Sequence, residues 1–354
     1  MTLIAAPGAA DAGEWEMAPP GDRGFAPDLG KRLDREYATG ALVNLHGVVV
    51  ARHGKLVLER YFEGVDERWG SGLGAVVFGP DVLHDLRSVS KSIVGLLYGI
   101  ALSEGKAPPL DTPLVDLFAY PDLVADTDRR RITVKHALTM TLGLQWDESQ
   151  PYVDERNSEI AMEMAADRYR FILEQPVVAA PGGTWIYNGG STALLAHLIA
   201  RGSGRSLHGY AAQKLFGPLG IDNSEWVDGT NGEAAAASGL RLTARGLAKL
   251  GQLVLNEGRW DGKQVVPKEW LVASFTEHAA AEDGLFYGYQ WWLGRSGPQQ
   301  RPWMAGFGNG GQRLVIIPHL DLVVAVLAGN YNQMDAWKLP VHIMTEVIFP
   351  SLTE

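Results

Sequence analysis

The two ends of the chain carry β-type hydrophobic patterns, whereas its middle carries helical ones. Near the N-terminus, two β-rich runs within residues 47–62 meet at His53-Gly54, which is typical of a hairpin. β-type runs return at 287–293, 312–317 and 322–327. Between the two ends, apolar positions recur at helical spacing with frequent glycine breakers. We therefore expect an α+β fold, in which both ends of the chain build one antiparallel sheet around a mostly helical insert.

The expected sheet domain is discontinuous in sequence, and the active site is expected between it and the helical domain. Short helices are expected near each end, at 26–37 and 337–348, and a buried helix is expected to begin near Ser88. The expected boundaries are 1–25 for a flexible arm rich in Gly, Pro and Ala, 26–106 and 276–354 for the sheet domain, and 107–275 for the mostly helical domain.

Composition excludes several classes of protein. The chain has 354 residues, of which 46% are hydrophobic and 20% charged, a balance that excludes intrinsic disorder. Its formal net charge of −10 argues against nucleic acid or an anionic membrane as the main partner. The longest apolar run, 93–102, is about half of the ~20 residues that cross a bilayer. A secretory signal has a basic segment followed by a long apolar core, and the start of this sequence shows neither, so the protein is expected to be cytoplasmic.

The chain contains no cysteine, which removes disulfides, thiolate metal sites and cysteine nucleophiles together. Nine histidines are scattered, and none forms a His-x-His or His-x-x-x-His pair that would nucleate a metal site. His136 and His197 fall in helical patterns and are expected to be packed or surface residues. We therefore expect no metal and no cofactor, and a covalent intermediate would have to form on another residue type.

The first candidate for such chemistry is the pair Ser88 and Lys91. Three residues apart, they share one face of a helix. A serine hydroxyl needs an adjacent base to act as a nucleophile, and a desolvated lysine can be that base once its ammonium loses its proton. A second copy of the spacing, Ser103 and Lys106, lies at the far end of the same helix, where the dipole has the wrong sign for an oxyanion. On spacing alone, the purely structural interpretation of Ser88 is a helix N-cap.

Two glycine-rich segments supply further candidates. Tyr187 lies directly before an apolar helix, where it could relay protons between a serine, a lysine and a leaving group, or simply anchor a turn. The segment 305–312 has glycines that allow a ligand to approach the backbone and leave N–H groups as oxyanion donors, although a flexible hairpin would share this composition. No Gly-Lys-Ser/Thr follows it, so it is not a phosphate loop.

Taken together and in this order, the three segments resemble the penicillin-recognising serine hydrolases. The similarity runs from about residue 47 to 331, and the branch it most resembles comprises class C β-lactamases, family VIII carboxylesterases and 6-aminohexanoate-dimer hydrolases. The resemblance implies a β-lactamase/transpeptidase-like fold. It makes Ser88 the acylated nucleophile, with Lys91 and Tyr187 accepting its proton, and makes the N–H groups of Ser88 and Asn309 the oxyanion hole. Substrate-binding positions implied near the cleft are Asn188, Gly308, Gly310 and Trp303.

Two departures from the family pattern bear on the substrate. The usual Tyr-x-Asn motif is here Tyr187-Asn188-Gly189, and the usual Lys-Thr-Gly is here Gly306-Phe307-Gly308. The cation and hydroxyl that would bind a substrate carboxylate are absent, and losing such a charge-assisted hydrogen bond costs ~1.5–3 kcal/mol. Arg313 lies past the turn, and we do not expect it to replace them. We expect a small-molecule ester or amide as substrate, and a carboxylesterase or amidase rather than a β-lactamase or D-Ala-D-Ala peptidase.

Three further classes of protein are compatible with the sequence. An α/β-hydrolase would use Ser191, because Gly189-Gly-Ser191-Thr-Ala193 nearly fits Gly-x-Ser-x-Gly, but glycine is missing at the last position. A metal hydrolase is the second class, and a penicillin-binding scaffold without catalysis is the third. The sequence does not give the oligomeric state or the acyl and leaving groups.

Overall fold

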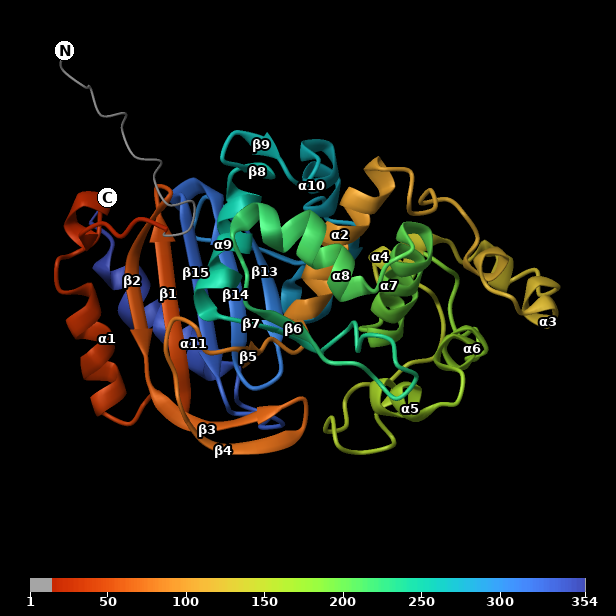
Figure 1. The fold of residues 1–354 in the computed structure, drawn as a ribbon, viewed down its shortest axis with the longest axis horizontal. Coiled ribbons are helices and arrows are strands. Elements are labelled where there is room, and N and C mark those ends of the chain that lie inside the picture. The colour runs from red at the N-terminus through yellow and green to blue at the C-terminus, as the bar shows by residue number, and fades with distance from the viewer. Residues whose placement is uncertain (1–14, 354) are drawn as a thin grey trace, which may run out of the picture.

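The structure, a computed structural model, describes residues 15–353 and is built on one eight-stranded antiparallel sheet (Figure 1). In spatial order the strands are β10 (Ala279–Ala280), β11 (Phe286–Tyr287), β12 (Trp292–Ser296), β13 (Arg301–Gly308), β14 (Gln312–Ile317), β15 (Leu322–Ala328), β1 (Leu45–Arg52) and β2 (Lys55–Tyr61). The two ends of the chain meet where β1 pairs with β15, with Val49 opposite Ala325. The expected sheet from both termini is confirmed.

The central strands are apolar on both faces because helices cover both. Every residue of β1 and of β15 is buried. The turn between β1 and β2 has positive φ at His53 (52°) and Gly54 (73°), as a two-residue hairpin turn requires, and the predicted hairpin is confirmed.

One face of the sheet carries the two terminal helices. α1 (Leu29–Ala38) and α11 (Lys338–His342), which continues through a π-helical turn to 348, pack their apolar side chains on β1 and β15. The other face carries α2 (Val89–Ser103) and α9 (Ala244–Leu255). α9 approaches so closely that a Cβ at Gly251 would lie 2.5 Å from a methyl group of Val323. α9 thus packs on the sheet although its residues fall within the predicted insert 107–275, whose boundaries stay predictions.

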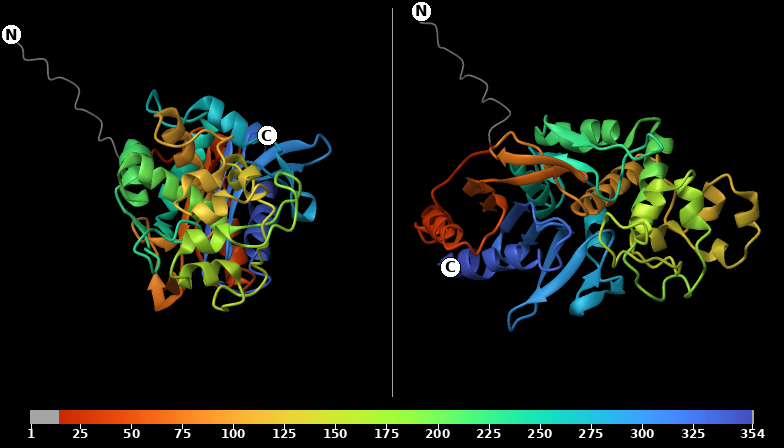
Figure 2. Two further views of the ribbon diagram at one scale, coloured as in Figure 1. Left: turned by 90° about the vertical axis from the view of Figure 1, so that its right-hand side faces the viewer. Right: turned by 90° about the horizontal axis from the view of Figure 1, so that it is seen from below.

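Most of the remaining helices gather at the end of the molecule opposite α1 (Figures 1 and 2). They are α3 (Pro121–Val124), α4 (Val134–Leu138), α5 (Ser158–Met164), α6 (Arg168–Leu173) and α7 (Gly189–Ser203), while α8 (Leu207–Ala211) and α10 (Lys268–Ser274) lie nearer the sheet. α2 packs against α7 on one side and against β13 and β14 on the other, and its residues 89–101 are all buried. α2 therefore joins the helical part to the sheet.

Three small sheets complete the fold. They are β3 (Glu63–Arg68) with β4 (Ser71–Val77), β5 (His84–Asp85) with β7 (Leu240–Leu242) and β6 (Ser224–Trp226), and β8 (Arg259–Trp260) with β9 (Lys263–Gln264). β5 leads directly into the N-terminus of α2.

The sequence pattern did not show how three segments pack. In the described part of the predicted arm, the backbone of Ala18 donates to Leu56 O (2.8 Å) and Phe25 is buried; residues 1–14 lie outside the described part. The Gly-rich stretch after residue 70 forms strand β4. The glycine motif at 306–308 lies inside β13, which the hydrophobic pattern did not reveal because its apolar positions are interrupted by glycine.

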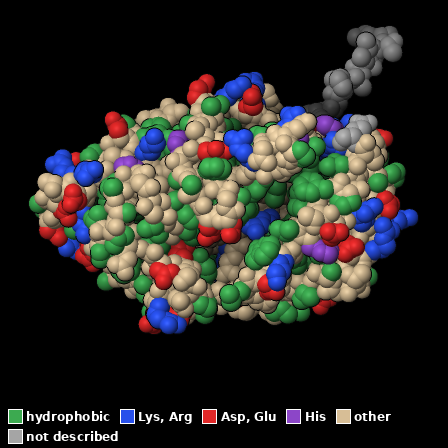
Figure 3. Space-filling model, turned by 180° about the vertical axis from the view of Figure 1, so that it is seen from behind, with side chains coloured by type: hydrophobic (Ala, Val, Ile, Leu, Met, Phe, Trp, Pro, Cys, Tyr) green, Lys and Arg blue, Asp and Glu red, His purple; other side chains and the backbone are tan. Residues whose placement is uncertain are grey.

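On the face of the molecule seen in Figure 3, acidic and basic side chains are interspersed among hydrophobic ones. Within residues 15–353, no helix is both long enough and apolar enough to span a bilayer.

Substituting Gly99 of α2 by alanine should destabilise the protein by about 1–3 kcal/mol, because a Cβ there would lie 2.2 Å from the indole of Trp270. In an open helix position the same change would stabilise. Urea unfolding measures the difference. Gly79→Ala, at a position with nothing within 4 Å of the new methyl, is the matched control and should change stability little. A Gly99→Ala protein as stable as this control would contradict the packing described for α2.

Candidate active site

Ser88 stands at the N-terminus of α2, after a residue in an uncommon conformation. Arg87 has φ 48°, which is rare for a side chain with a Cβ and is maintained here by its surroundings. Its guanidinium forms ion pairs with Glu67 and Asp85 and lies 4.6 Å from the ring centre of Tyr331. Ser88 occupies the N-cap position, but its side chain makes no capping hydrogen bond. Its hydroxyl is instead engaged with Lys91.

Lys91 is buried, with 1% exposure, and makes three polar contacts. Its Nζ donates to Ser88 Oγ at 3.0 Å, to a carboxylate oxygen of Glu159 at 3.2 Å and to the carbonyl of Ala237 at 3.2 Å. Three acceptors match the three donors of an ammonium group. The geometry thus fits a charged lysine that donates one of its hydrogens to the Ser88 hydroxyl oxygen.

The electrostatic surroundings of Lys91 differ from the sequence-based expectation. Burial alone lowers the pKa of the ammonium, but the carboxylates of Glu159 and Glu148 and the phenol of Tyr187 outweigh it and raise the pKa above its usual value. Lys91 is therefore an ammonium at neutral pH. A raised pKa disfavours the neutral lysine base that the apolar pattern of the helix suggested. The sequence pattern showed the apolar helix but not the two glutamates.

Tyr187 lies beside this pair, on the loop before α7. The Lys91 Nζ is 5.0 Å from the centre of its ring, which also stacks on Trp292. Burial raises the pKa of the Tyr187 hydroxyl, while the Lys91 ammonium and a hydrogen bond with Ser88 act in the opposite direction. The next residue, Asn188, turns its side chain away to cap α7 by accepting from the N–H of Ser191 (2.8 Å). The structure thus brings Ser88, Lys91 and Tyr187 together, whereas the side chain of Asn188 caps α7.

Glu148 connects the loop before α5 to the start of α7. One carboxylate oxygen accepts from the indole of Trp146 (2.6 Å) and the N–H of Gly189 (2.5 Å), and the other accepts from Tyr152 Oη (2.8 Å). Burial and the neighbouring carboxylate of Glu159 raise the pKa of Glu148, and Lys91 partly offsets this. Neither glutamate was predicted, because nothing in the local sequence distinguishes them from surface acids; the only signal was that a buried lysine needs a counter-ion.

The glycine-rich segment 305–312 brings β13 against the N-terminus of α2. A Cβ at Gly306 would lie 2.9 Å from Val89, and one at Gly308 would lie 2.4 Å from the carbonyl oxygen of Leu86. Both glycines are thus needed for close approach. The strand end places Asn309 at the same cavity as Ser88.

Asn309 is fixed by a residue that the sequence did not reveal. Its Nδ2 donates to Asn332 Oδ1 (2.9 Å), and its Oδ1 accepts from the N–H of Asn332 (2.7 Å). The adjacent Gly310 has φ 92°, a conformation that favours glycine, and its carbonyl accepts from the N–H of Asn330 (3.1 Å). These bonds hold the backbone of Asn309 in place beside the nucleophile.

A cavity of about 230 Å³ opens over Ser88. Each charged side chain that lines it has an oppositely charged partner: Glu67 pairs with Arg87, Glu159 with Lys91, and Glu163 with Arg168. The rest of its lining is mainly uncharged: Trp69, Gly70, Ser88, Tyr152, Val153, Ile160, Met164, Thr230, Ser238, Asn309 and Asn332.

Trp303 and Arg313 lie at a different cavity, also of about 230 Å³, on the face of the sheet covered by α11. The Arg313 guanidinium is 3.6 Å from the ring centre of Phe307, and burial lowers its pKa to about 10. Trp303 packs with the residues of that outer face. Neither lines the cavity over Ser88, so the position of Trp303 gives no support to its predicted role.

The competing motifs have structural uses. Ser103 and Lys106 bind Ile100 O and Glu104 respectively, and not each other. Ser191 is fully buried inside α7, and the antiparallel sheet excludes an α/β-hydrolase. His136 caps α4 and the His197 ring packs against Tyr169 with the ring centres 4.3 Å apart, as expected of packed residues.

A family model described as Beta-lactamase matches residues 35–336. The chain belongs to this family. The predicted resemblance is confirmed, and the nucleophile segment, the tyrosine segment and β13 all fall within the matched residues. The family assignment makes the chain a relative of hydrolases built on this fold.

Three known proteins are similar to this chain along most of its length. A 6-aminohexanoate-dimer hydrolase of Paenarthrobacter ureafaciens is 27% identical over 327 residues, covering 85% of this chain and 75% of the relative. Among solved structures, a putative 6-aminohexanoate-dimer hydrolase from Bacillus anthracis has a TM-score of 0.72 at 20% identity, covering 95% of this chain and 87% of its own. EstCE1, a hydrolase with promiscuous acyltransferase activity, also has 0.72, at 16% identity, covering 91% and 98%. These structures confirm the β-lactamase/transpeptidase-like fold.

Glu148→Gln should change how stability depends on pH. The raised pKa means that the folded state binds the Glu148 proton more tightly than the unfolded chain, so this contribution is present below about pH 4.5 and is lost as pH rises through the raised pKa. The stability of the native sequence relative to Glu148→Gln should therefore fall between about pH 5 and pH 8, by about 1.4 kcal/mol for each tenfold increase in proton affinity. Urea unfolding across this range measures it. Glu346→Gln, an exposed site, is the control, and a pH-independent difference for Glu148→Gln would contradict the burial of its charge.

Proposed function

We propose that the protein is a serine hydrolase that cleaves ester or amide bonds through an acyl-enzyme on Ser88. The observation that carries this proposal is the contact of 3.0 Å between the Ser88 hydroxyl and a buried ammonium, with a tyrosine beside them and a cavity that Ser88 lines. A capping serine would use its oxygen on the helix backbone, and Ser88 does not.

In the proposed cycle, Tyr187 moves the protons and Lys91 stays charged. The Ser88 oxygen bonds to the substrate carbonyl carbon while its proton passes to the phenolate form of Tyr187, which the Lys91 ammonium stabilises. The carbonyl oxygen becomes an oxyanion that accepts from the N–H groups of Ser88 and Asn309. Collapse breaks the bond to the leaving alcohol or amine, which takes the proton from Tyr187. Water then attacks the acyl carbon by the same route and releases Ser88.

The lining of the cavity favours a substrate without a carboxylate near the scissile bond. All charged side chains on the described cavity wall are already paired, so binding an anion would require breaking an ion pair. The side chain of a lysine at position 306 would meet Val89, so the usual cation cannot be restored simply by substitution. These points favour a carboxylesterase or amidase over a β-lactamase or D-Ala-D-Ala peptidase. Two similar proteins, a 6-aminohexanoate-dimer hydrolase and a hydrolase with promiscuous acyltransferase activity, support a hydrolase that transfers acyl groups.

A panel of short-chain p-nitrophenyl esters, linear amides including the 6-aminohexanoate dimer, and nitrocefin tests the proposal, with intact-mass detection of the acyl-enzyme. We expect ester or amide turnover and one acyl group per chain on Ser88. Ser88→Ala should abolish both turnover and fluorophosphonate labelling, while Ser191→Ala, in which a buried serine hydroxyl is removed, should keep labelling.

Two results would overturn this function. Nitrocefin turnover equal to the best ester would contradict the substrate class. Absence of turnover with every substrate, with Ser88→Ala identical to the parent, would indicate a scaffold without catalysis.

Tyr187→Phe should lower the rate of Ser88 acylation by about 10²-fold or more, because the proton acceptor is lost. Since the pKa of Tyr187 is raised, the phenolate fraction and hence the acylation rate of the native sequence should increase with pH throughout the neutral range. Stopped-flow acylation by a p-nitrophenyl ester measures both effects. Tyr37→Phe, on the surface, should behave like the parent. A Tyr187→Phe enzyme with the parental rate and pH profile would assign the proton transfer to another group.

A further inference from the structure

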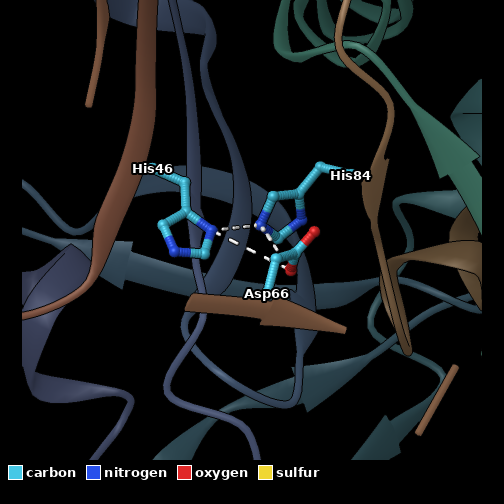
Figure 4. A group of neighbouring side chains, drawn as sticks. All are labelled: His46, Asp66 and His84. Carbon is cyan, nitrogen blue, oxygen red and sulfur yellow. Dashed lines mark hydrogen bonds and ion pairs between the residues drawn. The ribbon is translucent and has the colours of Figure 1, made fainter. Parts of the chain in front are cut away.

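Three buried ligand-type side chains meet away from the cavity over Ser88. His46 comes from β1, Asp66 from β3 and His84 from β5 (Figure 4). Their exposures are 0%, 2% and 0%. His46 Nδ1 lies 2.8 Å from His84 Nε2, and Asp66 Oδ1 lies 4.0 Å from the first and 3.7 Å from the second. We call these residues the His46–Asp66–His84 cluster.

The outer nitrogen of each ring is committed as a donor. His46 Nε2 faces Asn44 Oδ1 at 3.0 Å, and this amide is oriented because its Oδ1 accepts from the N–H of Val65 while its Nδ2 donates to Val65 O. His84 Nδ1 lies 2.8 Å from the carbonyl oxygen of Asp85, which can only accept. The proton of each neutral ring is therefore on the outer nitrogen.

It follows that the two inner nitrogens face each other with their lone pairs. Two lone pairs at 2.8 Å repel each other unless a cation lies between them. Histidines that hold a metal characteristically donate their other N–H to a carbonyl or similar acceptor, as both rings do here.

Asp66 adds the anionic ligand. Its Oδ1 accepts from Tyr331 Oη at 2.8 Å, which orients the carboxylate. Its Oδ2 is buried and has no hydrogen-bond partner among the described residues. A buried carboxylate with an oxygen that lacks a donor is destabilising, and a cation bound through Oδ1 would neutralise the charge of this carboxylate.

We propose that the His46–Asp66–His84 cluster binds a divalent transition-metal ion, with zinc as the best match to two imidazole nitrogens and one carboxylate oxygen. Tetrahedral Zn–N bonds of about 2.0–2.1 Å place the two nitrogens about 3.3 Å apart, so the rings need to separate by roughly 0.5 Å. The ion would tie together β1, β3 and β5. Asp66 binds Tyr331, whose ring underlies Arg87, so the ion would stabilise the turn before Ser88 rather than touch the substrate.

The sequence did not indicate this site, and the expectation of no metal was based on the absence of closely spaced histidine pairs. The two histidines are 38 positions apart in the sequence, and the three ligands lie on different strands. The proposal does not depend on the proposed hydrolase activity, because it concerns only metal uptake.

Zinc competition with a chromophoric chelator and cobalt(II) absorption, on chelator-treated protein, test the site. We expect one equivalent of either metal per chain and a metal-dependent rise in Tm. His84→Gln should abolish binding, and Asp66→Asn should weaken it at least tenfold. His53→Gln removes an exposed histidine paired with Asp321 and should bind as the parent does.

X-ray absorption of the zinc-loaded native protein gives a readout that does not rely on variants folding. We expect a shell of nitrogen and oxygen atoms with two imidazoles. The proposal is overturned if the native protein binds neither metal, in which case a shared proton occupies the gap, or if the bound zinc has fewer than two imidazole ligands.

Discussion

The burial of the Lys91 ammonium between Glu159 and Ser88 is the constraint on which the rest of the site depends. An ammonium at 1% exposure is tolerated only with a counter-ion and acceptors for its remaining hydrogens, and removing one partner of such a pair costs ~3–5 kcal/mol. Glu159, Ala237 and Ser88 supply these partners from three separate segments. The same bonds that keep the charge in the protein therefore also hold the Ser88 hydroxyl, and in the proposed mechanism they leave the proton transfer to Tyr187.

The fold supplies the close approaches that this arrangement needs. The residues of α2 from 89 to 101 are all buried. The chain before Ser88 turns through Arg87, which has a left-handed conformation, and packs against β13, where Gly308 adjoins Leu86. Substituting the usual lysine at Gly306 would disturb the packing of α2 on the sheet. Glycine at position 306 thus both departs from the Lys-Thr-Gly pattern of the resemblance and allows the tight packing of α2 on β13.

The sequence predicted what depends on local spacing and missed what depends on distant contacts. Ser88 and Lys91 lie one helical turn apart, and the hairpin at His53-Gly54 has turn residues that demand positive φ, so both were accessible from the chain alone. Glu159 lies 68 residues from Lys91, and its importance appears only once α5 folds over α2. The raised pKa of Lys91 depends on this contact, which the sequence pattern did not indicate. Asn332, the partner of Asn309, and the His46–Asp66–His84 cluster likewise depend on contacts between segments that are distant in the sequence and that only the folded chain brings together.

The most direct test of this account is the ionisation of Lys91 itself. NMR of protein labelled at the lysine side chains, with the Lys91 signal assigned by comparison with Lys91→Arg, follows its titration. The account predicts an ammonium that remains protonated beyond pH 10.5, the usual pKa of lysine, and that titrates at lower pH in Glu159→Gln. A Lys91 signal that titrates below pH 10.5 in the native protein would contradict it and would restore lysine as the neutral base.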